Sequence, residues 1–139
     1  MVAAVSVVRA HQIVLAAVDA ALEPHGLTFA RFEALALLHF SRRGALPMGK
    51  IGERLQVHPT SVTNAISRLE RDGLVRRVPS DRDRRTVLAQ ITPDGRETVV
   101  AAASALTAAG FGLDELPAAA LGRIHDALLP VRRAAGDLP

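Results

Sequence analysis

Residues 58–73 read HPTSVTNAISRLERDG, and this stretch predicts the helix that decides the fold of the chain. Pro59 suits a first helical turn, because the first amides of a helix have no partners within it. Gly73 suits the left-handed position just past a helix end. Between them, apolar side chains recur at the i, i+4 and i+7 positions of one helix face, at Val62, Ile66 and Leu69. We therefore expect a helix with one buried face.

The opposite face of this helix carries short polar side chains. Ser, Thr and Asn lower helix propensity, and recognition of base edges in the major groove of DNA would explain their presence. A polar face that only contacts water is the alternative. The candidate DNA-contacting residues on this helix are Thr60, Ser61, Thr63, Asn64, Ser67 and Arg68. His58, which precedes the helix, is suited equally to a phosphate contact and to capping the helix start.

The residues on either side of this helix extend the motif. Residues 48–55 are predicted to form a short helix with Ile51 and Leu55 inward, and residues 56–58 a tight link. A short helix, a tight turn and a polar-faced second helix make a helix-turn-helix. Residues 74–78 and 86–91 then alternate as strands do. The sequence predicts a mainly α winged helix-turn-helix with a two-stranded β-hairpin wing.

The wing is predicted to be strongly basic at its tip. Arg82, Arg84 and Arg85 lie in the loop between the two strands, and Arg76 lies on the first strand. We expect the wing to contact the minor groove or the DNA backbone while the helix enters the major groove. Asp83 and Arg85 would point the same way in an extended chain, so Asp83 is expected to orient the Arg85 guanidinium.

Three motifs give the chain a specific resemblance. They are LERDGLV at residues 69–75, the pattern Asp83-x-Arg85 and ITPDG at residues 91–95, and they resemble the MarR family of bacterial transcriptional regulators. A helix that opens at Leu27-Thr28 and ends in Leu37-Leu38 is similar to the second helix of that family. The resemblance covers nearly the whole chain.

The resemblance implies a homodimer, an arginine matching Arg85 in the minor groove, and a ligand cleft between the dimer helices and the winged part. Regulators of this family often bind small, frequently aromatic anions there. The residues of this chain that would line the cleft are His11, Arg31, Phe32 and His39. Phe32 as a core residue and Arg31 as a surface residue of a first helical turn are the alternatives.

Length and charge agree with a single DNA-binding domain. The chain has 139 residues, and its charge is concentrated between Arg42 and Arg85, where eleven Arg or Lys face five Asp or Glu, hence +6. The remaining residues hold six against nine, hence −3, which recovers the net +3. Such a distribution suits a phosphate-binding surface. We expect one domain over residues 1–139, with the winged helix-turn-helix at 28–92 and dimerisation helices at 1–24 and 93–139.

The terminal segments are predicted to be apolar helices. They are expected over residues 5–22, 92–109 and from Asp114 or Leu116 onward, with Pro130 kinking or ending the last helix near residues 126–129. Their apolar side chains could cover one another within a monomer. A homodimer is favoured, because a two-fold dimer presents two recognition helices to a palindromic site. The expected interface residues are Val5, Val8, Leu15, Leu121, Ile124 and Leu128.

Composition argues against several other classes. The chain has no cysteine, its five histidines lack metal-ligand spacing, and no nucleophile-base grouping or phosphate loop is present, so no metal, cofactor or catalytic site is expected. The apolar first 21 residues contain Arg9, His11 and Asp19, which argues against a signal peptide or membrane span and for a cytoplasmic protein.

These observations predict a sequence-specific regulator that binds palindromic operator DNA as a homodimer. A repressor is the favoured role and an activator is the alternative. Release by a small aromatic or anionic effector is what the family resemblance implies. An architectural protein that binds double-stranded DNA without a discrete operator is one alternative. A winged-helix protein-interaction module or enzyme is the other.

Overall fold

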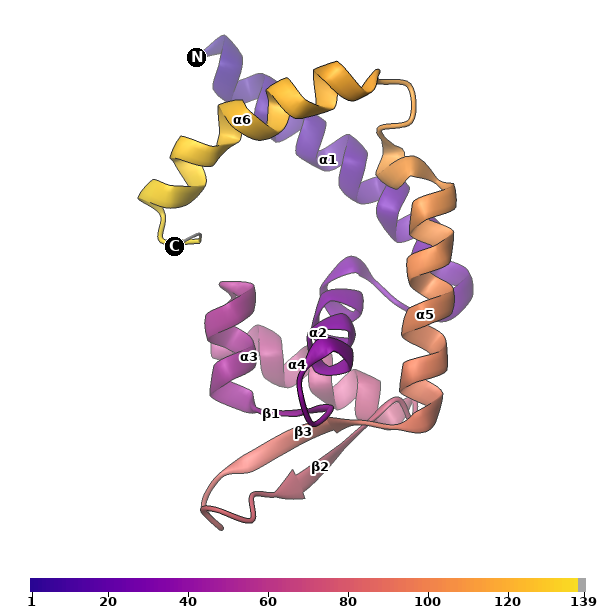
Figure 1. Ribbon diagram of the computed structural model, residues 1–139, viewed down its shortest axis with the longest axis vertical. Helices are drawn as coiled ribbons and strands as arrows, with labels where there is room; N and C mark the ends of the chain where they lie inside the picture. Colours follow the sequence, from indigo (N-terminus) through magenta and orange to yellow (C-terminus); the bar gives the residue numbers. More distant parts are fainter. Residues whose placement is uncertain (138–139) are drawn as a thin grey trace.

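Six α-helices and a three-stranded antiparallel sheet make up the computed structural model, which describes residues 1–137 (Figure 1). The elements, in chain order, are α1 (Val2–Leu22), η1 (Glu23–His25), α2 (Phe29–Phe40), β1 (Ala45–Pro47), α3 (Met48–Leu55), α4 (Pro59–Arg71), β2 (Val75–Pro79), β3 (Val87–Ile91), α5 (Pro93–Ala108), η2 (Gly110–Gly112) and α6 (Ala118–Ala134). In Figure 1, α1 and α6 lie at one end, the β2–β3 hairpin extends at the other, and α5 runs between them. The mainly α winged helix-turn-helix predicted from the sequence is confirmed.

Helix α4 forms as its sequence predicts. Pro59 occupies its first turn, and the three stripe residues Val62, Ile66 and Leu69 are all buried. Gly73, just past its end, has a φ of 77°. The amide of Leu74 donates to the Leu69 carbonyl at 2.9 Å, which closes the helix end.

The turn between α3 and α4 depends on two backbone features. Gln56 caps α3 in the left-handed region at φ 55° and ψ 41°, and its amide donates to the Gly52 carbonyl. A Cβ at Gly52 would lie 3.3 Å from both the Val57 carbonyl oxygen and Val62 Cγ2. The glycine, which costs helix propensity, therefore lets the two helices approach closely.

The sheet has one strand more than the sequence predicts. Strand β3 pairs with β2 from Val75↔Ile91 to Pro79↔Val87. On its other side it pairs with β1 from Ala45↔Gln90 to Pro47↔Leu88, so the expected two-stranded wing was incomplete. A three-residue strand that ends in proline has no detectable alternation of its own. Strand β1 forms because its backbone can pair with the edge of β3 that β2 leaves unpaired.

The core joins the winged part to the C-terminal end of α1 and to one face of α5. Leu35, Leu38, Ile66 and Leu69 are fully buried, and Leu22 and Leu106 pack into the same cluster. Thr28 caps α2, as predicted, and Asp19 Oδ1 of α1 accepts a hydrogen bond from the Phe29 amide at 2.7 Å. These bonds fix α1 against α2 where the core begins. Helix α6 contributes no buried residue.

Helix α6 departs from its prediction at both ends. It begins at Ala118 and continues through Pro130 to Ala134, so of the two expectations for Pro130 the end near residues 126–129 is wrong, and the kink stays a prediction. Proline removes one helix hydrogen bond, but water can satisfy the freed carbonyl of an exposed helix. Beyond the helix, Gln56 Nε2 donates to the Gly136 carbonyl at 3.1 Å, which brings the end of α6 to the helix-turn-helix.

Thr92 joins the wing to α5. Its hydroxyl accepts from the Gly95 amide at 3.0 Å, the predicted helix cap, and donates to the Gly73 carbonyl at 2.8 Å. Gly95 lies directly against the start of the wing, because a Cβ there would be 2.2 Å from the Leu74 carbonyl oxygen and 2.8 Å from Ile91 Cγ1. We call this contact of Gly95 with Leu74 and Ile91 the joint between the wing and α5, and it leaves no room for a side chain at residue 95.

We expect Gly95→Ala to lower the free energy of unfolding by about 1–3 kcal/mol, because the added methyl group meets backbone that cannot move aside freely. Gly49→Ala is the matched control. Gly49 lies in α3 with nothing within 4 Å of its would-be Cβ, so alanine there should stabilise by about 0.5–1 kcal/mol. Thermal denaturation of both variants checks the prediction. A Gly95→Ala protein at least as stable as the parent would contradict the close approach.

Candidate nucleic-acid interface

The outward face of α4 carries three of the predicted DNA-contacting residues. Thr60, Thr63 and Asn64 are exposed on the side away from the buried stripe. The Thr63 hydroxyl donates to the Pro59 carbonyl at 3.1 Å, so its oxygen lone pairs remain available as acceptors. This face can therefore offer both hydrogen-bond donors and acceptors to base edges.

Two further predicted residues of α4 lie on the flank that faces α2. Ser61 lines a small cavity together with Ala30 and Glu33 of α2. Burial first, and the nearby Asp137 carboxylate second, raise the pKa of Glu33. Arg68 Nε donates to Asp72 Oδ2 at 3.2 Å. A DNA contact by Ser61 or Arg68 stays a prediction.

Ser67 is held by an arginine that the sequence did not single out. Arg77 on β2 donates from Nη2 to Ser67 Oγ at 2.8 Å, and its backbone amide donates to Glu70 Oε1 at 3.1 Å. Its guanidinium also forms an ion pair with the Glu70 carboxylate. The network fixes α4 to the wing and leaves the Ser67 hydroxyl proton free to donate. The strand pattern alone did not show that Arg77, and not its neighbour Arg76, would contact α4.

His58 caps α4. Its Nδ1 accepts a hydrogen bond from the Thr60 amide at 3.1 Å. With Nδ1 acting as acceptor, the ring proton of a neutral His58 lies on Nε2. An Nε2–H donor on an exposed side chain is suited to a phosphate oxygen, so the capping role leaves the predicted phosphate contact possible.

The wing exposes its arginines but orders them differently from the prediction. Arg82, Arg84 and Arg85 are all exposed. Asp83 Oδ1 accepts from the Arg85 backbone amide at 2.9 Å, and Asp83 Oδ2 accepts from Thr86 Oγ1 at 3.1 Å. The expected contact between Asp83 and the Arg85 guanidinium is therefore replaced by contacts that hold the loop backbone. In an extended chain the side chains of Asp83 and Arg85 would point the same way. That expectation is wrong here because the chain turns at Arg84 and Arg85.

On the strands of the wing, the predicted residue Arg76 is also ordered. Arg76 is exposed on β2, and its Nε donates to Gln90 Oε1 directly across the sheet at 2.8 Å. The guanidinium is thereby held at the sheet surface with its remaining N–H groups available.

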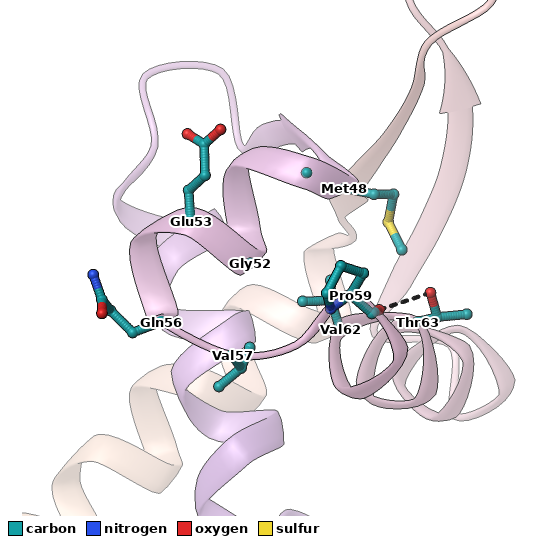
Figure 2. Close-up of a pocket in the computed structure, with 9 residues that line it drawn as sticks. Met48, Gly52, Glu53, Gln56, Val57, Pro59, Val62 and Thr63 are labelled. Atoms are coloured by element: carbon teal, nitrogen blue, oxygen red, sulfur yellow. Dashed lines mark hydrogen bonds between the residues drawn. The ribbon is translucent and has the colours of Figure 1, made fainter. Parts of the chain in front are cut away.

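A groove of about 480 Å³ separates α3 from α4 beside this face. Figure 2 shows Glu53 and Gln56 on the α3 side, with Pro59 and Thr63 on the α4 side. Gly52 forms part of its lining. The groove lies next to the outward face of α4 and gives the helix-turn-helix a concave surface.

The four predicted ligand-cleft residues lie in separate surroundings within one chain. His11 is exposed on α1, and Arg31 Nε donates to Thr28 Oγ1 at 3.2 Å. The rings of Phe32 and Phe29 stack with centroids 6.4 Å apart. His39 packs edge-on against Phe40, and within residues 1–137 its Nδ1 is buried with no hydrogen-bond partner. The chain alone does not bring these side chains together.

The predicted interface residues remain accessible in the single chain. Val5 and Val8 on α1 are 54% and 56% exposed, and Ile124 on α6 is 45% exposed. Leu15, Leu121 and Leu128 are half-buried. The alternative in which the terminal helices cover one another within a monomer is therefore not what the structure shows.

No group of three or more His, Cys, Asp or Glu side chains in residues 1–137 is placed to hold a metal ion. One stretch, Val2–His25, is long and apolar enough by length and composition to cross a membrane. Core helices of soluble proteins and signal sequences share this length and composition.

The chain is similar in sequence and in fold to known transcriptional regulators. The MarR family model matches residues 25–86. The crystal structure of Sco5413, a MarR family transcriptional regulator from Streptomyces coelicolor, is 54% identical with a TM-score of 0.94, covering 100% of this chain and 96% of that one. CouR from Rhodococcus jostii, solved bound to p-coumaroyl-CoA, is 27% identical with a TM-score of 0.74, covering 88% of this chain and 86% of that one.

Among curated proteins, the transcriptional repressor MdtR of Bacillus subtilis is 35% identical over 53% of this chain and 46% of its own length. The chain spans about half the length of the curated relatives it matches. The Sco5413 match, in contrast, runs the full length of this chain, through the terminal helices as well as the winged part. The chain therefore belongs to the MarR family of transcriptional regulators.

Proposed function

We propose that the chain is a sequence-specific DNA-binding repressor that occupies a palindromic operator as a homodimer. The observation that carries the proposal is the pairing of two surfaces. The polar outward face of α4 is fixed by the Arg77 network to a wing whose three tip arginines are exposed. A helix for base edges and a basic hairpin for the flanking backbone or minor groove are the parts that such binding requires.

The dimer in this proposal is supported by the exposed apolar surface of the terminal helices. Val2, Val5, Val7, Val8 and Ile13 of α1 are each at least half exposed. Several exposed apolar side chains on one helix are typical of an interaction surface in a water-soluble protein. A second copy of the chain offers the same surface, as a two-fold interface requires.

We also propose that a small aromatic or anionic effector releases the operator. The relative CouR was solved with p-coumaroyl-CoA bound. In this chain, His39 Nδ1 is a buried polar atom without a partner among residues 1–137, which a ligand could satisfy. His11, Arg31, Phe32 and His39 come from helices α1 and α2, so the partner's helices would be needed to complete their site. Among the relatives, MdtR is named a transcriptional repressor and BadR a transcriptional activatory protein, so the choice of repression is part of this proposal.

Selection of bound sequences from random DNA, followed by footprinting, tests the operator directly. A discrete palindrome with two protected half-sites is expected. Binding without a palindrome would instead indicate an architectural protein, and absence of salt-sensitive DNA binding would indicate a protein-interaction module.

Replacing Asn64 tests base recognition by α4. Asn64 is exposed on the outward face, so Asn64→Ala should leave thermal stability nearly unchanged. If Asn64 makes a bidentate contact, the variant should lose about 1–3 kcal/mol at one base position of the operator. Gel shifts on a set of single-base operator variants measure this. Ser104→Ala, an exposed change on α5, is the control. An equal loss on random DNA would mean that Asn64 only positions the backbone.

Replacing the wing arginines separates groove recognition from general attraction. Arg85→Ala should weaken binding and erase a preference for A·T pairs that flank the half-sites, because a narrow A·T minor groove favours an inserted arginine. Arg84→Ala should mainly reduce the slope of log affinity against log salt, by the amount expected for about one lost phosphate contact. Gel shifts over a salt series, on operators with A·T or G·C flanks, distinguish the two. A flank preference that survives Arg85→Ala would refute the role of that residue.

A charge on the apolar face of α6 tests the dimer. Leu128→Asp would bury an unpaired carboxylate in the proposed interface, which is costly, and should give monomers with weakened operator binding. Ala119→Asp is the matched control, because Ala119 is exposed on the other face of α6. Sedimentation velocity and gel shifts report both properties. A folded Leu128→Asp dimer of unchanged operator affinity would exclude α6 from the interface.

A further inference from the structure

A second groove of about 480 Å³ lies along the edge strand β1, beside the wing. It is formed by the end of α2, the loop that follows, β1, α3 and the hairpin. Its lining includes Phe40, Arg42, Arg43, Arg54, Arg82 and Leu88. The proposed function gives no task to the first four of these or to Leu88.

The arginines of this groove are not neutralised within the chain. All four are exposed, and within residues 1–137 none of them forms an ion pair, whereas Arg31, Arg68, Arg77 and Arg132 each contact a carboxylate. Asp81 is the one acidic residue in the lining. Four positive charges against one negative charge make a field that attracts anions.

The groove is separate from the face of α4. Gly49, Gly52 and Gln56 line the groove between α3 and α4, whereas Arg54 of the same helix lines the groove along β1. The two grooves therefore lie on different sides of α3. Arg82 connects the second groove to the wing, which the proposed function places on DNA.

The shape of the groove indicates the kind of anion. Phe40 is 84% exposed and the arginines stand at an open rim. Small-molecule sites normally enclose most of their ligand, which this groove would leave in water. A nucleic-acid backbone needs no such enclosure, since charges along a rim are sufficient for its phosphates. The apolar side chains Phe40, Leu46 and Leu88 offer surface to the deoxyribose rings between the phosphates.

We propose that this groove binds the phosphodiester backbone of duplex DNA just outside the segment contacted by α4 and the wing. The inference rests on the proposed function and adds to it a second, sequence-independent contact on each protomer. Its consequence is that affinity depends on the length of the flanking duplex.

The test compares the full chain with two variants that remove equal charge. Arg42→Ala/Arg43→Ala alters the groove, and Arg123→Ala/Arg133→Ala removes two exposed arginines of α6 as the control. Each protein is titrated, over a salt series, with the selected operator trimmed to its two half-sites and with the same operator extended by about one helical turn, roughly ten base pairs, at each end. Equal melting temperatures establish that both variants fold.

The parent protein should bind the extended duplex more tightly than the trimmed one. The groove variant should lose that advantage, and its slope of log affinity against log salt should fall by about two units on the extended duplex, at about 0.9 per lost phosphate contact. Its affinity for the trimmed duplex, and both affinities of the control variant, should match the parent.

Other results would overturn the inference in distinguishable ways. Specific binding of the trimmed operator with no gain from the flanks, or an unchanged slope in the groove variant, refutes the groove contact and leaves the proposed function standing. No specific binding of either duplex refutes the proposed function and this inference with it. Calorimetric binding of inorganic pyrophosphate that the groove variant loses, while its DNA binding is unchanged, would assign the groove to a small phosphate ligand instead.

Discussion

The burial of one stripe of α4 is the constraint on which the rest of the molecule depends. Val62, Ile66 and Leu69 are buried against the core that α2 and the sheet complete. Removing these side chains from water sets the rotation of the helix about its axis, and that rotation alone points Thr63 and Asn64 outward. Arg77 then fixes the remaining freedom by joining Ser67 and Glu70 to the wing. Hydrophobic burial thus sets the rotation of α4 about its axis, and the hydrogen bonds and ion pair of Arg77 fix α4 relative to the wing.

Local signals were sufficient to predict the elements that carry this arrangement. The caps at Thr28 and Thr92, the proline at the start of α4 and its apolar spacing all act within a few residues, so a single sequence contains them. Strand β1 could not be predicted in this way, because its pairing with β3 is a long-range contact. The passage of α6 through Pro130 depends on exposure, which local sequence does not report.

The candidate site was predictable as a surface but less so residue by residue. Helical spacing separated the polar face of α4 from its buried stripe, yet it could not place α2 beside Ser61. The Asp83-x-Arg85 pattern was expected to place the Asp83 carboxylate against the Arg85 guanidinium, but the turn directs the carboxylate to backbone and hydroxyl donors. Arg77 was missed because its partners lie seven and ten residues away on another element.

The joint at Gly95 gives α5 a mechanical role. Gly95, which has no side chain, packs directly against the Leu74 backbone, and the Thr92 hydroxyl makes two hydrogen bonds. These contacts leave the wing little freedom to move relative to the N-terminal end of α5. A helix of 16 residues is about 24 Å long at 1.5 Å per residue, so it can act as a lever. A tilt of about 5° at its far end displaces the attached winged part by roughly 2 Å over that length. In the proposed dimer, small rearrangements among the terminal helices would thus change the spacing of the two α4 helices on DNA.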